Sequence, residues 1–240
     1  MKTHLFYPGG NPTALIENLD NQISRNDYPK ISRDILKNQK NIEQVGFIEI
    51  GKNGNYRCQM MGDEFCINSL RSLGLWIYGK FGKKQFEIES SGTTATFKME
   101  VENWIAINLS KKYSIKQPEK NLKFIELEGI CHFVQEIKKS DWSKEKFKKL
   151  FKEILKKYSF LTKDNPAIGL ISVDENNKIY PLVYVKETDS LIFESACGSG
   201  TLAAFIADKS KNRFTQPSNH LYIVEENQNG FTLKSIVSKI

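Results

Sequence analysis

The sequence predicts an α/β protein of the α+β kind, in which two pseudo-symmetric domains each wrap a mostly antiparallel sheet around a central helix. Two observations support this fold class. The same order of segments occurs twice along the 240 residues, and in each half a short strand runs into a cysteine that opens a helix, at Cys66 and again at Cys197. This arrangement would bring the N-termini of both helices to a cleft between the domains, where we expect the functional site.

The N-terminal half begins with a pair of strands. Residues 3–18 predict a short strand, a Gly-Gly-Asn-Pro turn and a second strand, because Gly, Asn and Pro favour turns between apolar runs. A helix is expected over residues 27–38. A strand over residues 42–51 then ends at Lys-Asn-Gly-Asn, a turn signal of the hairpin kind.

The helix opened by Cys66 is predicted to be buried, because apolar residues cover much of its surface. Strands are expected within residues 84–110, where residues 94–101 show the period-two alternation of a half-buried strand. Residues 113–121 are typical of a linker. The apolar positions of the helix are Leu70, Leu73, Trp76 and Ile77.

The C-terminal half repeats this order. A strand over residues 124–135 precedes an amphipathic helix over about 143–158, whose lysines we interpret as its solvent-facing side. The helix opened by Cys197 follows a strand over residues 190–195. Further strands are expected over residues 167–176, 178–187, 220–227 and 230–240.

The length of the chain allows two domains, since domains commonly hold about 100–200 residues. We place the N-terminal domain at residues 1–112, where it carries Cys66 and is completed by the C-terminal strand at about 229–240. The C-terminal domain covers residues 113–228 and carries Cys197.

Composition and charge exclude several classes of protein. With 40% hydrophobic and 26% charged residues, the chain resembles an ordinary globular protein and not a disordered one. No apolar run approaches the roughly 18 residues that span a bilayer, and no apolar signal core is present, so we expect a cytoplasmic protein without a membrane partner. The net charge of +7 comes from lysines interleaved with acids, which argues against nucleic acid as a partner.

The four cysteines form neither a CxxC pair nor a cluster with histidine, so we expect no metal site. In a reducing cytosol they should be free thiols. Cys58 and Cys131 lack a helix-opening context and are predicted to be packed core residues. Cys66 and Cys197 instead stand where the first amides of a helix are unpaired and its dipole is positive, a position that stabilises a thiolate.

Two thiols that face one another across a cleft suit racemisation, in which a proton leaves one face of a carbon and another arrives at the opposite face. One cysteine must be a thiolate and the other a thiol, and their roles exchange with the direction of the reaction. The amides of the two helices can bind a carboxylate and stabilise the charge that develops beside it. This chemistry requires no cofactor, and the sequence contains neither a Walker A motif nor a dinucleotide fingerprint.

Four segments resemble the diaminopimelate epimerase-like family of cofactor-independent amino-acid racemases: "YPGGNPT", "EQVGFIE", "MGDEFCINS" and "VYVKETDSLIFESACGSGT". They follow the family's order and spacing over nearly the whole chain, and they are most similar to the histidine racemases of opine-metallophore biosynthesis. The resemblance implies the diaminopimelate epimerase-like fold, no cofactor and a small-molecule amino acid as partner, with histidine the leading substrate. It leaves a homodimer open.

The resemblance also implies roles for individual residues. Cys66 and Cys197 match the two acid–base thiols of the family, and Glu194 could pair with the substrate's ammonium or side chain. Glu43 lies in the block shared with the histidine racemases, where a glutamate is expected at the active site. The expected substrate-binding residues are Asn11, Glu43, Gln44, Asn68, Ser69, Glu194, Gly198, Ser199 and Gly200.

Two departures from the family pattern bear on the substrate. Ile67 stands where the family has a glycine, which affects how closely a carboxylate can approach that amide. "FESAC" is too short to hold the Glu-Arg pair and the Gly-Glu-Thr stretch of the diaminopimelate enzymes, which argues against a second substrate carboxylate. The alternatives are a racemase or epimerase of another amino acid, including diaminopimelate, and a non-racemase isomerase or ligand-binding protein of the same fold.

Overall fold

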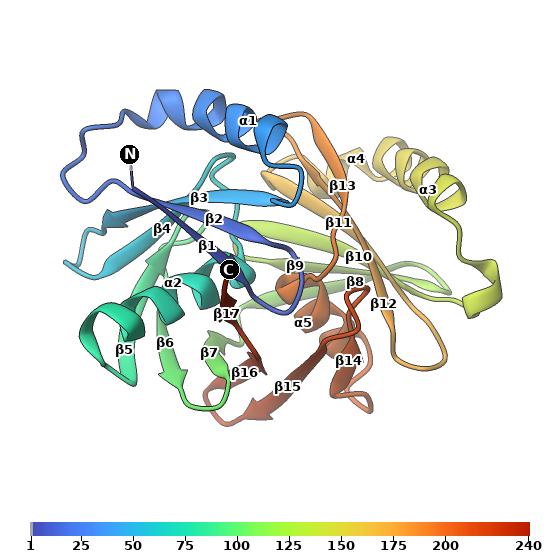
Figure 1. Ribbon diagram of the computed structural model, residues 1–240. Coiled ribbons are helices and arrows are strands. Elements are labelled where there is room, and N and C mark those ends of the chain that lie inside the picture. Colours follow the sequence, from blue (N-terminus) through green and yellow to red (C-terminus); the bar gives the residue numbers. More distant parts are fainter. Residues whose placement is uncertain (1) are drawn as a thin grey trace.

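The computed structural model describes residues 2–240. These residues form two sheets, each of which lies between an outer and an inner helix (Figure 1). Within these residues the first sheet has eleven strands and the second has six. In spatial order the first sheet contains β14 (Arg213–Thr215), β15 (Leu221–Asn227), β16 (Gly230–Ser235), β7 (Ile105–Ser110), β6 (Thr96–Val101), β5 (Gln85–Ser90), β4 (Tyr56–Met60), β3 (Gln44–Ile50), β2 (Thr13–Glu17), β1 (Thr3–Tyr7) and β17 (Ser238–Lys239). The second contains β13 (Ser190–Phe193), β12 (Ile179–Val185), β11 (Ala167–Val173), β10 (Ile130–Glu136), β9 (Leu122–Leu127) and β8 (Tyr113–Glu119).

Most neighbouring strands are antiparallel, which confirms that part of the predicted fold class. Three pairs are parallel, namely β2 with β3, β4 with β5, and β10 with β11. The remaining elements are the helices α1 (Tyr28–Asn38), α2 (Ile67–Phe81), α3 (Lys144–Lys157), α4 (Ser159–Thr162) and α5 (Gly198–Ala207), and the short 3₁₀ helices at Arg25–Asp27 and Lys139–Asp141.

The outer helices α1 and α3 are amphipathic and each covers one sheet. Tyr28 of α1 stacks on Phe47 of β3, with ring centroids 3.5 Å apart. The amphipathic helix predicted at 143–158 is confirmed as α3. It buries Phe147, Phe151 and Ile154 against β9–β12, while its lysines face solvent.

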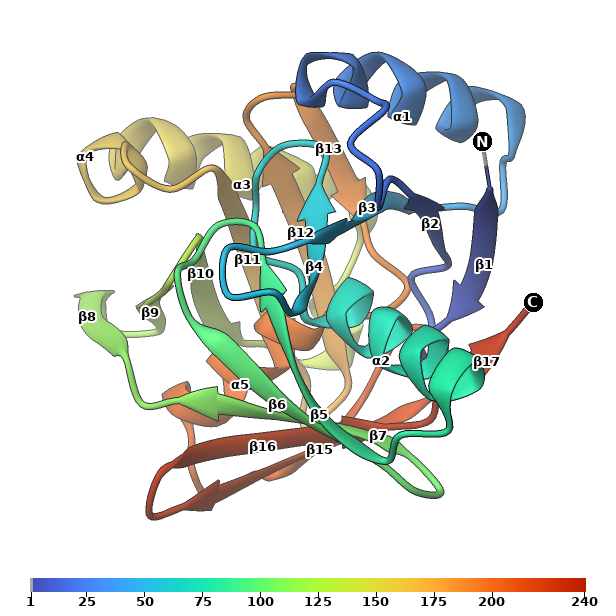
Figure 2. The ribbon, with the colours of Figure 1, turned by 90° about the vertical axis from the view of Figure 1, so that its left-hand side faces the viewer.

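The inner helices α2 and α5 are buried around most of their circumference. The first sheet curls around α2, so that β2 and β4 contact one side of the helix and β5–β7 the other (Figure 2). Helix α5 contacts β9–β11 of the second sheet and β15 of the first. Because β3 and β11 are covered on both faces, burial does not alternate along them: six of the seven residues of β3 and all seven of β11 are buried.

Two of the predicted elements in the second half are wrong. Residues 113–121 do not form a linker, because β8 occupies Tyr113–Glu119 and pairs with β9. An edge strand tolerates the lysines and Pro118 that suggested a linker, since its outer side needs no partner. The single strand predicted over 124–135 is two strands, β9 and β10, joined by a turn whose Gly129 has a φ of +75°.

The C-terminal residues return to the first sheet. Strand β16 pairs with β7, and β17 pairs with β1, so that the first and last strands lie side by side (Figure 2). Strands β14 and β15 extend the same sheet. The division into domains at residues 112 and 228 stays a prediction. Within residues 2–240, no helix combines the length and apolar character needed to cross a membrane.

Candidate active site

The N-terminal ends of α2 and α5 face each other. Each helix has a cysteine at its N-cap, and the two caps have nearly the same extended backbone: φ −134° and ψ 105° at Cys66, φ −137° and ψ 112° at Cys197. A Cβ placed on Gly198 would lie 2.7 Å from the Cβ of Ile67, so the first turns are in direct contact. Both cysteines line one small cavity of about 40 Å³.

Cys66 is half-buried and has a neutral partner. Its thiol donates a hydrogen bond to Oε1 of Gln44 at 3.1 Å. Burial raises the pKa of Cys66 to about 11, and the nearby charge of Glu194 acts in the same direction. The hydroxyl and backbone N–H of Ser69 oppose this shift, because polar hydrogens near the sulfur favour the thiolate.

Cys197 is buried more deeply and lies next to a carboxylate. Burial raises its pKa well above the ordinary value, and the charge of Glu194 raises it further. The backbone N–H of Gly200 donates to the sulfur at 3.3 Å and acts in the opposite direction. The backbone N–H of Cys197 donates to Oε1 of Gln216 at 2.9 Å, which holds the residue at the start of α5.

Glu194 has a strongly perturbed carboxyl group. Although part of the residue is accessible, its Oε2 is buried and has no hydrogen-bond partner. Burial raises the pKa of Glu194 to about 8, and the charges of Glu43 and Glu64 contribute to the rise. Its Oε1 accepts a hydrogen bond from Nδ2 of Asn11 at 3.4 Å. At neutral pH this group is therefore mostly protonated in the free protein.

Asn11 joins the first turn of the chain to the segment before Cys197. It lies at φ +53° in the turn between β1 and β2, and its backbone N–H donates to Oγ of Ser195 at 2.6 Å. Its Nδ2 also donates to Oε1 of Gln44 at 3.2 Å, whereas its buried Oδ1 has no partner. Glu43 accepts a hydrogen bond from the backbone N–H of Ser195 at 3.0 Å.

A buried arginine holds the start of α2 in place. Nη2 of Arg71 donates to Oδ1 of Asn68 at 2.8 Å, to the carbonyl of Pro8 at 2.9 Å and to the hydroxyl of Tyr222 at 2.6 Å. Nδ2 of Asn68 in turn donates to the carbonyl of Ala196 at 3.0 Å. The orientation of Asn68 is thus determined by residues from both ends of the chain.

Most of the residues expected from the sequence border the cavity. The expected residues that line it are Asn11, Gln44, Cys66, Asn68, Glu194, Cys197, Gly198 and Ser199. Glu43, Ser69 and Gly200 are not among its lining residues: Glu43 binds the backbone of Ser195, and the other two act on the sulfurs. Cys58 and Cys131 are confirmed as packed core residues.

Several cavity residues were missed by the sequence analysis. They are Glu64, Phe65, Ile130, Ala167, Val183 and Val185. Glu64 had a usable signal, because it precedes Cys66 by two residues as Glu194 precedes Cys197 by three. The four aliphatic residues read as ordinary strand interior, since only the packing of the sheet brings them to the cavity.

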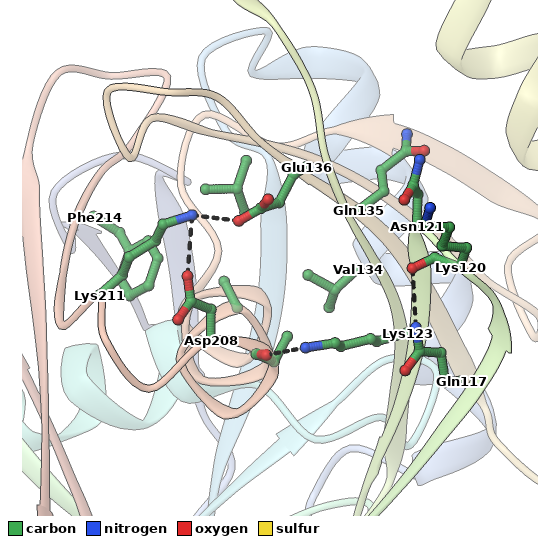
Figure 3. Close-up of a pocket in the computed structure, with 13 residues that line it drawn as sticks. Gln117, Lys120, Asn121, Lys123, Val134, Gln135, Glu136, Asp208, Lys211 and Phe214 are labelled. Atoms are coloured by element: carbon green, nitrogen blue, oxygen red, sulfur yellow. Dashed lines mark hydrogen bonds and ion pairs between the residues drawn. The ribbon is translucent and has the colours of Figure 1, made fainter.

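A larger hollow of about 530 Å³ opens at the C-terminal end of α5, away from the thiols (Figure 3). Most of its charged side chains already have partners. Lys211 binds both Glu136 and Asp208, and Nζ of Lys123 donates to the carbonyl of Ala207 at the end of the helix. We assign the chemistry to the smaller cavity, because it contains both thiols and the unpaired first amides of two helices.

The geometry suits acid–base chemistry at a carbon next to a carboxylate. Two proton-carrying sulfurs border one space, and the helix N-termini beside them favour an anion. Among residues 2–240, no group of three or more His, Cys, Asp or Glu side chains is arranged to hold a metal ion.

Comparison with known sequences gives consistent results. The family described as the histidine racemase CntK N-terminal domain matches residues 4–236. A histidine racemase of Fusobacterium nucleatum is 33% identical over 244 residues, which cover 92% of this chain and 88% of that protein. A histidine racemase of Staphylococcus aureus is 26% identical over 212 residues, which cover 82% of this chain and 75% of that protein.

Comparison with solved structures shows the fold. A protein from Pseudomonas aeruginosa described as a "predicted epimerase" matches with a TM-score of 0.68 at 8% identity, over 99% of this chain and 96% of that one. A phenazine biosynthesis protein of the PhzF family from Bacillus anthracis matches with a TM-score of 0.65 at 11% identity, over 100% and 98%. The predicted fold class, two pseudo-symmetric halves around central helices, is confirmed.

Proposed function

This chain belongs to the histidine racemase family and is an amino-acid racemase that acts on a small-molecule amino acid, and we propose that it interconverts L- and D-histidine with Cys66 and Cys197 as the two acid–base groups. The observation that carries this proposal is that both cysteines cap a helix and border the same small cavity. Histidine is the proposed substrate because the relatives from both organisms are histidine racemases.

In the proposed reaction, one cysteine is a thiolate and the other a thiol. The thiolate takes the Cα proton from one face of the substrate, and the electron pair of that bond delocalises into the substrate carboxylate. The thiol then gives its proton to the opposite face of the same carbon. The enzyme finishes with the two roles exchanged, so the protonation state belongs to the pair and not to either cysteine alone.

We propose that the substrate carboxylate binds the first amides of the two helices. Residues 67–68 and 198–199 line the cavity, and their N–H groups belong to first turns that lack intrahelical partners. An anion held there benefits from both helix dipoles, and the charge that develops during proton removal is stabilised in the same way. The side chain of Ile67 packs against Gly198. We propose that the substrate carboxylate comes closest to the backbone N–H groups of Gly198 and Ser199.

The substrate ammonium is proposed to bind Glu194 and Asn11. Oε2 of Glu194 and Oδ1 of Asn11 are both buried acceptors without a partner, and an ammonium group supplies three donors. Its positive charge also offsets the carboxylate that raises the pKa of Cys197. Binding of the substrate would therefore make the thiolate easier to form.

The cavity must widen before it can hold an amino acid. Its volume of about 40 Å³ is close to the ≈ 30 Å³ that one water molecule occupies in the liquid. The walls belong to both sheets and both inner helices, so we propose that these parts separate to admit the substrate.

Cellular context and assembly belong to the same proposal. All four cysteines are free, and a reaction that needs reduced thiols suits a reducing cytoplasm. We propose that no cofactor, membrane or nucleic acid takes part, because thiols and helix amides supply the required chemistry. A homodimer is the oligomeric state to examine first.

The experiment is proton NMR of the reduced protein in D₂O with a panel of L-amino acids, followed by chiral chromatography. Loss of the α-proton signal of histidine together with the appearance of D-histidine is the expected result. Exchange of another amino acid, diaminopimelate included, in place of histidine would mean that the proposed substrate is wrong. The absence of exchange across the panel, with the thiols shown to be reduced, would contradict the proposed reaction.

A further inference from the structure

Glu64 is a buried carboxylate of the cavity wall that the proposed reaction does not use. It is 7% exposed and lies in the loop between β4 and α2, two residues before Cys66. Its Oε2 accepts a hydrogen bond from the backbone N–H of Gly62 at 2.9 Å. Among residues 2–240, Glu64 has no ion-pair partner.

The loop that carries Glu64 is held firmly. The hydroxyl of Ser91 donates to the carbonyl of Glu64 at 2.6 Å and accepts from the backbone N–H of Met60 at 3.0 Å. A Cβ placed on Gly92, which has a φ of +71°, would lie 2.5 Å from the backbone nitrogen of Phe65. The carboxylate of Glu64 is therefore presented from a packed and well-defined backbone, as a specificity group must be.

The carboxylate lies next to an apolar wall. A Cβ placed on Gly62 would lie 2.8 Å from Oε2 of Glu64 and 2.6 Å from Cγ1 of Val185. Ala167 and Val185 are direct partners on β11 and β12, so these aliphatic side chains form one continuous surface of the second sheet. The apolar wall consists of Ile130, Ala167, Val183 and Val185.

The cavity thus has two chemically different sides. Asn11, Gln44 and Glu194 form the polar side, close to the sulfurs and to the turn between β1 and β2. The other lining residues include the apolar wall and a single further carboxylate, that of Glu64. A flat, mostly apolar ring that carries an N–H donor matches this second side, because the wall packs against the ring faces and the carboxylate accepts its hydrogen bond.

We propose that Glu64 and the apolar wall form the subsite for the substrate side chain, in which Glu64 accepts a hydrogen bond from a ring N–H of the imidazole. The inference rests on the proposed racemisation of histidine and makes Glu64 a specificity-determining residue. Burial raises the pKa of Glu64 to about 7, so a cationic or N–H-bearing side chain is favoured as the partner that keeps it ionised. A carboxylate in this position disfavours an aliphatic side chain, which would leave it buried and unpaired.

The test compares Glu64→Gln with the parent and with Glu187→Gln as a matched control. Glu187 is exposed, yet its Cβ lies within 3.7 Å of a Cβ placed on the same Gly62, so the control removes a charge from the same region outside the cavity. Racemisation of L-histidine and of its two ring-N-methylated forms is followed by chiral chromatography, with KM and kcat measured separately. Thermal unfolding of each variant verifies that the loop remains folded.

The expected result is a rise in KM for histidine of about 10- to 100-fold in Glu64→Gln, with a smaller change in kcat, because Glu64 contacts the side chain and not Cα. Glu187→Gln should match the parent. The parent should also discriminate against one of the two N-methyl histidines, the one that lacks the ring N–H to which Glu64 is proposed to bind.

Three outcomes would overturn the inference. An unchanged KM for histidine in Glu64→Gln would show that Glu64 does not contact the ring. An equal loss in Glu187→Gln would show that the effect is one of general charge. A parent enzyme that does not racemise histidine would refute the proposed substrate and this inference together, whereas the first two outcomes leave the proposed function standing.

Discussion

The two helix starts that carry the thiols have the same backbone and different surroundings. Helix α2 begins Cys66-Ile67-Asn68-Ser69, and α5 begins Cys197-Gly198-Ser199-Gly200. The residue after the cysteine is a large aliphatic one in α2, Ile67, and a glycine in α5, Gly198. The side chain of Ile67 occupies the space that a side chain at position 198 would need. The two halves therefore place the sulfur in the same way, whereas the residues that follow it, Ile67 and Gly198, differ in size and fit against each other.

The electrostatic surroundings differ as well. Cys66 donates to the neutral amide of Gln44, whereas Cys197 has the carboxyl of Glu194 close by. Burial raises the pKa of both thiols, to about 11 for Cys66 and well above the ordinary value for Cys197. The thiolate should form more readily at Cys66. A shared backbone geometry thus does not make the two proposed acid–base groups equivalent.

The largest effect is expected from removing either thiol. Cys66→Ala and Cys197→Ala should each lower racemisation by about 10³-fold or more, since general acid–base groups contribute about 10²–10⁴-fold and both are required. Residual α-proton exchange in D₂O should be confined to opposite enantiomers in the two variants, because each remaining sulfur serves one face of Cα. Cys58→Ala, which removes a core thiol outside the cavity, should stay within a few-fold of the parent. Exchange of the same enantiomer in both variants would contradict the two-face arrangement.

A smaller effect is expected from substitutions at Ile67 and Gly198, the residues that follow the two cysteines. Gly198→Ala places a Cβ 2.7 Å from Ile67, so it should lower the free energy of unfolding by about 1–3 kcal/mol and reduce kcat/KM by about tenfold, since a displacement of about 1 Å can cost about 10²-fold. Ile67→Gly in the same chain removes the obstacle, so it should cost less in the Gly198→Ala background than in the parent. Chemical denaturation and racemisation rates of the two single variants and the double variant measure the coupling. Strictly additive effects would mean that the two residues do not share one space.

The smallest change expected is a shift of the pH profile in Glu194→Gln, which comes in addition to the weaker binding that follows from losing the carboxylate proposed to hold the substrate ammonium. Above a pH of about 8, Glu194 is ionised in the free enzyme and raises the pKa of Cys197. Removing that charge should lower the pKa of Cys197, so the rise of kcat/KM with pH should begin about one pH unit lower. Below pH 7 the position of the profile should change little, because Glu194 is already protonated there. A profile that keeps its position, as expected for the Glu187→Gln control, would exclude Glu194 as the group that separates the two thiols.

Local chemistry accounts for what the sequence predicted well. The amphipathic period of α3 and the apolar helix opened by Cys66 follow from which side chains must leave water, and both are confirmed. The predicted linker at 113–121 is wrong, because a polar, proline-containing segment and an edge strand have the same composition. Whether such a segment pairs depends on a neighbouring strand that composition does not reveal.

The sequence was sufficient to identify the two thiols and the helices that follow them, since a cysteine before a helix start is a local feature. The family motifs identified the residues around the thiols. Which groups share the cavity follows only from the packing of the folded chain. That packing brought Glu64 and the aliphatic residues of β10–β12 to the same space and turned Glu43 toward the backbone of Ser195. The physical reason is that burial and pKa depend on every element that packs around a group, and those elements come from distant parts of the chain.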